Sequence, residues 1–325
     1  MLSPSARHSP PPSLFPGAGL GREARRWTPR LGALLLGISL WLALSSPAAH
    51  AAEVTVLLDG NVAQYREAQG AAKGVLPDAT ILDVSSPDLK PQLERTASVG
   101  GVILAIGHKA LLAAQGSGAT VVFCMVLGPS ASTAKNVTGL RLEVVPSLQL
   151  SFIKRVHPGA KRLGMIYDAR TWNAYVQEAT QAATAQGLTV VPRAVGDARE
   201  VRAALSEIAG NIDALWLIPD PSLVNIEIFN FLLVSTLERK LALFGFFADF
   251  TRRGALASIA PDYAEIGKQA AKLAAELASK PPASRSPLPA SLASPGGLTI
   301  NAKTARQLGI ELSDEVQASA KQVYR

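Results

Sequence analysis

Short apolar runs alternate with longer amphipathic stretches along most of this chain. Runs rich in Val, Ile and Leu predict strands, and longer stretches with apolar residues at helical spacing predict the helices between them. In the first half the expected strands are 54–58, 79–84, 101–106 and 119–127, and the expected helices are 62–74, 87–99, one opening at 109–114, and 146–156. Nearly continuous apolar strands separated by helices are typical of parallel sheets buried on both faces.

The same alternation restarts near residue 161. The second set of expected strands is 161–167, 188–192, 213–218 and 241–247, and the helices between them are 172–186, 197–209 and 224–239. Two rounds of this pattern predict an α/β protein with two doubly wound lobes. The remaining expected elements are a helix over 262–279 capped by Asp262, a Pro- and Ser-rich surface loop at 280–297, a strand at 298–301, and one or two terminal helices.

The amino terminus has the three parts of a secretory signal peptide. Residues 1–30 carry five Arg and one Glu, residues 31–44 form a 14-residue apolar run, and Ala49-His50-Ala51 matches a cleavage site. The alternative is a membrane anchor, but 14 helical residues rise only ~21 Å, which is less than the ~30 Å hydrocarbon core. We therefore expect residues 1–51 to be a signal peptide and the protein to be located in the periplasm.

Removal of this leader changes the electrostatic interpretation. The whole chain is +7 and residues 1–51 account for +4, so +3 remains over 274 residues. Because no basic stripe is interleaved with aromatic residues, this charge argues against a nucleic-acid partner. Cys124 is the single cysteine, which excludes a disulfide framework, and two of the four histidines fall in the leader. We therefore expect no metal and no cofactor.

The sequence carries no recognisable catalytic motif. It has no G-x-S-x-G elbow, no G-x-x-x-x-G-K-[ST] loop and no H-E-x-x-H pattern. Polar and aromatic residues instead follow the expected strands, where open α/β sheets bind ligands. The candidate ligand-binding residues are Asn61, Gly107, His108, Tyr167, Thr171, Asp220, Ser222, Phe247 and Asp249. Such a ring, without a nucleophile and its base, favours a binding protein over an enzyme.

Structural roles stay open for several of these candidates. Asp220 could cap the helix that follows it, and His108 could be a loop histidine that makes only local hydrogen bonds. Tyr167 and Phe247 could serve in packing, and Asp249 could be a solvent-exposed hinge residue. The sequence pattern alone does not decide between these roles and ligand contact.

Several spans of the chain resemble one transporter family. The spans are 136–139, 159–168, 213–220, 253–257 with 262–271, and 298–310. The most specific of them is the N-x-K-T-A-x-x-L-G-I stretch from Asn301 to Ile310. Together they resemble the periplasmic substrate-binding components of ABC transporters, in the tryptophan/tyrosine-type branch, over roughly residues 54–312.

The resemblance implies a type I periplasmic binding fold, in which two Rossmann-like lobes joined by a three-strand hinge close on a small ligand. The amino-terminal lobe would comprise 52–140 plus 250–290, and the carboxyl-terminal lobe 141–249 plus 291–325. The implied ligand is a small organic molecule, amino acid-like or aromatic, which is delivered to an ABC permease in the inner membrane. We expect the protein to be a monomer.

The sequence departs from the family pattern at three turns. Gly-His-Lys-Ala at 107–110 replaces a Thr-Pro-Ala-Ala-type turn, and Gly128-Pro129 replaces Asp-Pro. Phe-Phe-Ala-Asp at 246–249 replaces a stretch rich in Ser, Asp and Glu. Fewer polar groups then remain to pair the charged ends of an amino acid, and an unpaired buried charge is costly. These departures indicate a ligand that is either less polar or altogether different.

Two rival functions stay open at this point. One is a periplasmic sensor, in which the closed lobes signal to a membrane kinase or an outer-membrane receptor instead of a permease. The other is a secreted enzyme in which His108 acts together with Asp59 or Asp220. The enzyme would need a nucleophile that the sequence does not reveal.

Overall fold

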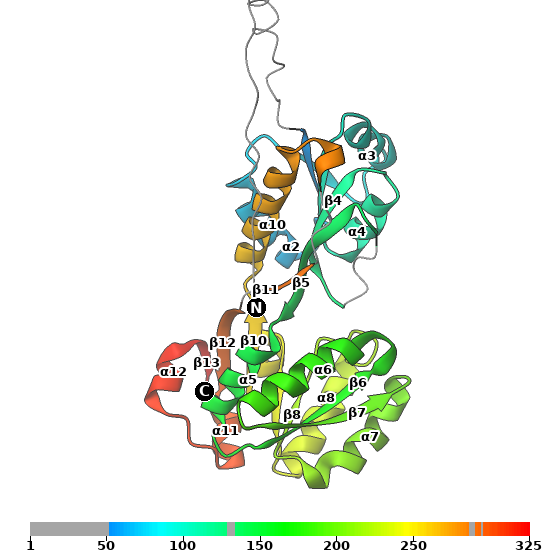
Figure 1. Ribbon diagram of the computed structural model, residues 1–325. Helices are drawn as coiled ribbons and strands as arrows, with labels where there is room; N and C mark the ends of the chain where they lie inside the picture. Colours follow the sequence, from blue (N-terminus) through cyan, green and yellow to red (C-terminus); the bar gives the residue numbers. More distant parts are fainter. Residues whose placement is uncertain (1–51, 129–133, 286–289, 294) are drawn as a thin grey trace, which may run out of the picture. The chain divides into compact units, whose positions relative to one another are not determined.

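Two β-sheets, each covered by helices on both faces, make up the part of the chain that the computed structural model describes (Figure 1). The described residues are 52–128, 134–285, 290–293 and 295–325. The signal peptide expected over 1–51 lies outside them. None of the described helices is long and apolar enough to cross a membrane.

The first sheet has six parallel strands in the order β11-β5-β4-β3-β1-β2. Its strands are β1 (Val54–Leu58), β2 (Thr80–Asp83), β3 (Val102–Ile106), β4 (Thr120–Val126), β5 (Val137–Val144) and β11 (Ser291–Ala293), and its helices are α2 (Ala63–Lys73), α3 (Leu89–Ser98), α4 (His108–Gln115) and α10 (Tyr263–Ala278). Along β3, Val102 and Leu104 pack with α2 and α10, whereas Ile103 and Ala105 pack with α3 and α4. The strand is apolar throughout because both of its faces are buried.

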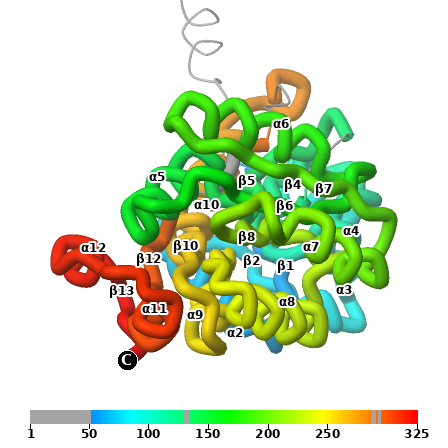
Figure 2. Tube along the Cα trace, turned by 90° about the horizontal axis from the view of Figure 1, so that it is seen from below, coloured from blue at the N-terminus to red at the C-terminus, as the bar shows by residue number. Residues whose placement is uncertain are grey.

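The second sheet has seven strands in the order β13-β12-β10-β9-β8-β6-β7, and only the β10–β12 pair is antiparallel. Its strands are β6 (Arg162–Asp168), β7 (Thr189–Val195), β8 (Ala214–Trp216), β9 (Ala242–Gly245), β10 (Ala257–Pro261), β12 (Pro295–Asn301) and β13 (Ala320–Tyr324). The helices that follow these strands or precede them are α5 (Pro146–Val156), α6 (Ala169–Ala185), α7 (Val201–Ile208), α8 (Ile226–Glu238), α9 (Ala248–Arg253), α11 (Ala302–Leu308) and α12 (Asp314–Ser319). The carboxyl-terminal segment, orange to red in Figure 2, adds the two strands at one edge of this sheet.

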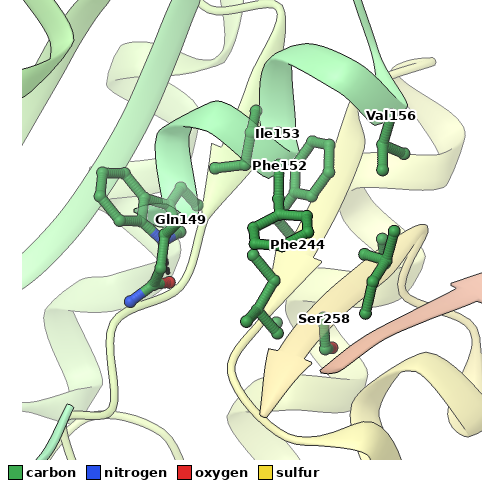
Figure 3. A pocket seen from close by; sticks show the side chains of 11 residues that line it. Gln149, Phe152, Ile153, Val156, Phe244 and Ser258 are labelled. Carbon is green, nitrogen blue, oxygen red and sulfur yellow. Dashed lines mark hydrogen bonds between the residues drawn. The ribbon is translucent and has the colours of Figure 1, made fainter. Parts of the chain in front are cut away.

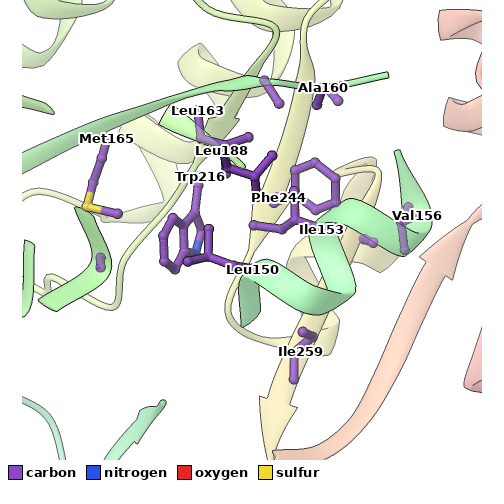
Figure 4. Packing of buried hydrophobic residues seen from close by; sticks show 14 of the residues in the cluster. Leu150, Ile153, Val156, Ala160, Leu163, Met165, Leu188, Trp216, Phe244 and Ile259 are labelled. Carbon is purple, nitrogen blue, oxygen red and sulfur yellow. The ribbon is translucent and has the colours of Figure 1, made fainter. Parts of the chain in front are cut away.

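Apolar layers cover both faces of the second sheet. Helices α5 and α6 pack on one face, where Leu150 and Ile153 share a buried cluster with Met165 and Trp216 (Figure 4). Helices α7 and α8 pack on the other face, where Phe229 is fully buried. The two doubly wound sheets expected from the sequence are thereby confirmed.

Most expected elements are present, with ends that shift by a few residues. Helix α5 spans 146–156 as expected, and Oδ1 of Asp262 caps α10 by accepting a hydrogen bond from the Glu265 N–H at 2.9 Å. The hydrophobic pattern does not predict β5, β10, β11, β13 or α9, and β11 and the start of β12 lie in the segment 280–297 that is expected to be a loop. Gly139 and Arg141 interrupt β5, β10 contains Ser and Pro, and the last described strand stands where only helices are expected.

The expected lobe boundaries differ from the membership of the sheets. Residues 250–290 are expected in the first lobe, but β10 belongs to the second sheet. Residues 291–325 are expected in the second lobe, but β11 pairs with β5 in the first sheet. All of β5 also lies in the first sheet, beyond the boundary expected at residue 140. The reason is that the chain passes between the sheets three times, after β5, after β10 and after β11.

A buried polar network surrounds Gln149 at the start of α5. Its Nε2 donates to the carbonyl oxygen of Val144 and to Oη of Tyr175, each at 3.0 Å, and its Oε1 accepts from Nε1 of Trp216 at 3.0 Å. Gln149 and Phe244 line a void of only about 10 Å³, and Figure 3 shows how the two side chains lie. That is room for about one water molecule, so the void is a packing feature and not a ligand site.

Helices α2 and α10 lie side by side on the first sheet and approach closely (Figure 1). Small residues face one another here, and Ala68 and Ala270 are fully buried. A Cβ atom added to Gly267 of α10 would lie 2.0 Å from the carbonyl oxygen of Ala68. The contact between the helices therefore requires a glycine at this position.

Candidate functional site

A cavity of about 770 Å³ lies at the carboxyl ends of strands from both sheets. Residues that follow β1, β3, β4, β6, β8 and β9 contribute to its wall. The lining residues are Val62, Gln64, Tyr65, His108, Met125, Leu127, Gly128, Leu142, Thr171, Trp172, Asp220, Pro221, Ser222, Phe247, Ala248, Asp249 and Tyr263. A concave, largely apolar wall with a few polar groups is typical of small-molecule sites.

Six of the nine candidate residues line this cavity, and they are His108, Thr171, Asp220, Ser222, Phe247 and Asp249. Asn61, Gly107 and Tyr167 are not among the lining residues. Asn61 is exposed in the turn after β1, where its N–H donates to Oδ1 of Asp59 at 3.2 Å. Tyr167 is buried in the core beside α6, which agrees with its alternative role in packing.

Gly107 shapes the wall without lining it. Its φ is +93°, and an added Cβ would lie 2.4 Å from ring atoms of Tyr65. The glycine therefore lets the Tyr65 ring lie against the backbone at the end of β3. Burial raises the pKa of Tyr65, since the phenolate form is disfavoured away from water. Gly107, which stands where the resemblance implies a Thr-Pro-Ala-Ala-type turn, thus makes room for the Tyr65 ring.

Met125 lines the cavity from an irregular strand end. The register of β4 against β5 shifts between Phe123 and Val126, and Met125 within this shift has a φ of +59°. Non-glycine residues with positive φ are uncommon, and bulges of this kind redirect a side chain at the end of a strand. Hydrophobic periodicity cannot reveal Met125, because the bulge breaks the alternation along the strand.

The sequence reasoning also missed three aromatic residues of the wall, Tyr65, Trp172 and Tyr263. Each lies in the first turn of a helix, namely α2, α6 and α10. Trp172 is fully buried, and its Nε1 has no hydrogen-bond partner among the described residues. Burial raises the pKa of Tyr263 to about 12. An aromatic residue in the first turn after an expected strand was the available signal for Tyr65 and Trp172, whereas β10, which precedes Tyr263, is not predicted.

Asp220 is the buried acid of the cavity, with only 1% of its surface exposed. Its Oδ1 accepts hydrogen bonds from the N–H of Ser222 at 3.0 Å and from the Ser222 hydroxyl at 2.6 Å, and its Oδ2 accepts from the Asp168 N–H at 3.2 Å. Asp220 does not cap the next helix, because Asn225 does so by accepting from the Ile228 N–H at 2.9 Å. The capping alternative holds only for the turn over residues 222–225, where Asp220 accepts from the Ser222 N–H through its side chain and from the Leu223 and Val224 N–H groups through its carbonyl oxygen.

Two other acids near the cavity, Asp249 and Asp59, are paired with cations. Asp249 accepts hydrogen bonds from Arg252 and from Nε of Arg253, the latter at 2.6 Å, and these arginines lower its pKa, with Arg253 the main cause. Nζ of Lys109 lies 2.8 Å from Oδ2 of Asp59, and this hydrogen bond is the main cause that lowers the pKa of Asp59. Asp249 is therefore a rim residue whose charge is already compensated.

The enzyme alternative required His108 to act with Asp59 or Asp220. In the structure the Asp59 carboxylate binds Lys109, and the Asp220 carboxylate binds Ser222 and a backbone N–H. Within the described part of the chain, neither acid is hydrogen-bonded to the imidazole that it would have to orient. No group of three or more potential metal ligands occurs among the described residues.

Glu143 is a buried acid of β5, and it follows the cavity residue Leu142 in the sequence. It is 1% exposed, its Oε1 accepts from the Gly128 N–H, and its Oε2 has no partner among the described residues. Burial is the main cause that raises the pKa of Glu143. The charged form of this side chain therefore destabilises the folded state.

Glu143→Gln is expected to stabilise the protein at pH 7 and to have a smaller effect at pH 4. In the unfolded chain Glu143 releases its proton at the ordinary Glu pKa near 4.5, whereas in the folded state it keeps the proton to a higher pH. The wild type therefore loses stability as the pH rises from the lower of these pKa values to the higher one. The glutamine keeps an acceptor for Gly128 and removes the titration. Urea unfolding at both pH values measures the difference, and a difference that does not grow with pH would contradict the assignment.

Comparison with known proteins identifies the chain's family. A family model described as ABC transporter substrate binding protein matches residues 114–324. The chain belongs to this family. Within the ABC transporter substrate-binding proteins, a curated tyrosine-binding protein from Clostridioides difficile (strain R20291) is 28% identical over 146 residues, which cover 44% of this chain and 41% of that protein. The chain thus matches less than half the length of this curated relative.

Solved structures of substrate-binding proteins show the same fold. An ABC domain in complex with L-Trp from Streptococcus pneumoniae is 21% identical, with a TM-score of 0.59 and coverage of 84% of this chain and 100% of that one. A ligand-free, open substrate-binding protein with adhesive properties from Clostridium difficile is 18% identical, with a TM-score of 0.62 and coverage of 84% and 99%. The two-lobed type I periplasmic binding fold implied by the sequence is confirmed.

Proposed function

We propose that this protein is the extracytoplasmic substrate-binding component of an ABC-type uptake system, and that it captures a small organic molecule without transforming it. The observation that carries the proposal is the cavity, because residues from both sheets contribute aromatic and polar side chains to one wall. Membership of the family and the L-Trp or tyrosine ligands named for its relatives support an amino acid-like or aromatic ligand.

The proposed mechanism is a shift in the population of conformations. A ligand that touches both halves of the wall stabilises the arrangement in which both halves meet it, and the difference in contact energy sets how far the equilibrium moves. The wall offers Tyr65 and His108 from the first half and Thr171 and Phe247 from the second. The closed form would then be recognised by a permease, and the binding component would act as a monomer in the periplasm.

Phe247→Ala is expected to weaken ligand binding about tenfold, or ~1.4 kcal/mol, because an aromatic contact in the wall is lost. The ligand is first found by thermal-shift screening of the purified protein against amino acids, amines, vitamins and aromatic acids, since a bound molecule raises the melting temperature. Calorimetry then measures the affinity of both proteins for that ligand.

Phe152→Ala is the matched control. Phe152 is also a partly buried phenylalanine, but it lines the small void in the second sheet's core and not the cavity. We expect its affinity to stay within twofold of the wild type. Equal losses in the two variants, or unchanged affinity in Phe247→Ala, would remove this wall from the ligand site.

A further inference from the structure

We propose that the ligand of this cavity is an organic cation, in which an ammonium group is attached to an aromatic or apolar body that lacks a carboxylate. The inference rests on the proposed function, because it names the ligand class of the same cavity. Three observations carry it: the environment of the Asp220 carboxylate, the aromatic content of the wall, and the charges of the described lining residues.

The Asp220 carboxylate is buried without a cationic partner in the described part of the chain. Its three hydrogen bonds come from uncharged donors, two from Ser222 and one from the Asp168 N–H. No lysine, arginine or histidine among the described residues forms an ion pair with it. A buried negative charge is costly unless an opposite charge compensates it, and a cationic ligand in the cavity supplies that charge.

The nearby cations are already engaged. Arg170 binds the Asp168 carboxylate, with its Nη2 2.6 Å from Oδ2. Lys109 binds Asp59, and the two arginines after Asp249 bind that acid. These pairs match the surrounding acids. Arg170 also interacts electrostatically with Asp220, but it forms no ion pair with it, so Asp220 is the buried acid of the described wall without a direct cationic partner.

Three partly exposed aromatic side chains, Tyr65, Phe247 and Tyr263, line the same cavity, and Trp172, which also contributes to the wall, is fully buried. Aromatic faces attract organic cations through their quadrupoles, and the attraction is stronger where water is excluded. The wall therefore combines an aromatic surface with one buried acid.

The carboxylate of an α-amino acid would find neither a lysine nor an arginine among the described lining residues, which include the histidine His108. The buried Asp220 carboxylate would repel it. An amine that keeps the same ring and lacks the carboxylate avoids this repulsion and retains the contact with Asp220. The cavity therefore discriminates against zwitterions by charge and not by size.

The test uses three compounds that share an indole ring and differ in charge: tryptamine, L-tryptophan and indole-3-propionate. Calorimetry with the purified protein at pH 7 is expected to show at least tenfold tighter binding of tryptamine than of the other two. This ranking is measured on the wild type, so it does not depend on the folding of any variant.

Asp220→Asn is expected to weaken tryptamine binding at least tenfold and to reduce its preference over indole-3-propionate. Asp197→Asn is the matched control, since it removes the same charge at a residue that Arg199 already compensates and that does not line the cavity. We expect less than a threefold change in that variant. Thermal unfolding of each variant shows that the comparison is made between folded proteins.

The outcomes separate this inference from the proposed function. Tightest binding by L-tryptophan or indole-3-propionate would overturn the organic-cation assignment and leave an aromatic-ligand binding protein standing. Equal tryptamine affinities for wild type and Asp220→Asn would also overturn it. If neither these compounds nor the broader screen of small organic molecules yields a ligand, the proposed function itself fails.

Discussion

Gly267→Ala is expected to lower the free energy of unfolding by about 3 kcal/mol, because it overpacks the contact between α2 and α10. The new Cβ would lie 2.0 Å from the carbonyl oxygen of Ala68 and 2.7 Å from its Cα, so the neighbour that must move is backbone. Alanine favours helix over glycine by about 1 kcal/mol, which offsets only part of this cost. Urea unfolding followed by circular dichroism measures the change.

Gly70→Ala provides the control within the same pair of helices. Gly70 is an exposed residue inside α2, and an added Cβ there would meet no atom within 4 Å. With no packing cost, the helix preference of alanine should stabilise the protein by about 0.5–1 kcal/mol. The same substitution should thus have opposite signs at the two positions. Stabilisation by Gly267→Ala would show that the helices can separate at little cost.

Gln149→Leu is expected to destabilise the protein by about 3 kcal/mol, because it leaves a buried N–H of Trp216 without its acceptor and removes a donor to Val144. Gln149 and Trp216 are 4% and 1% exposed, so water does not readily replace the lost partners. Tyr175 still donates to the Val144 carbonyl oxygen at 3.2 Å, which limits the loss. The change is measured as a shift in the urea midpoint.

Gln177→Leu is the corresponding control, since Gln177 is an exposed residue of α6. Its effect on the free energy of unfolding should stay within about 0.5 kcal/mol. If Gln149→Leu were equally mild, the hydrogen bonds around Trp216 would contribute little to stability, and the apolar contacts of α5 would account for its position.

The fold was largely predictable because its strands are buried on both faces. A run such as Val102–Ile106 is apolar at every position, and this signal does not depend on knowledge of the neighbouring strands. β10 is a strand of Ala, Ser, Ile and Pro, and it pairs with β12, about forty residues later in the chain. Its conformation depends on that distant partner, so the local hydrophobic pattern does not reveal the strand.

The candidate site was predictable where its residues directly follow strands. His108, Asp220 and Phe247 could be proposed because the carboxyl ends of parallel strands meet at one edge of a sheet. Met125 could not be found, since its direction depends on a bulge, and Tyr263 could not, since α10 begins after a strand of the other sheet. Tertiary arrangement, which no local pattern records, decides these positions.

The three passages of the chain between the sheets have a consequence for the order of folding. Strands β1 to β5 come first in the sequence, but the core of their sheet is completed by Ile266 and Ala270 of α10, and its edge by β11. A polypeptide that emerges amino end first, from a ribosome or a translocation channel, must therefore hold its earliest strands incompletely covered while β6 to β10 are delivered. The first sheet thus waits longest between its first strand and its completing elements, which gives a chaperone the longest time to act on it, whereas the second sheet is completed afterwards by β12 and β13.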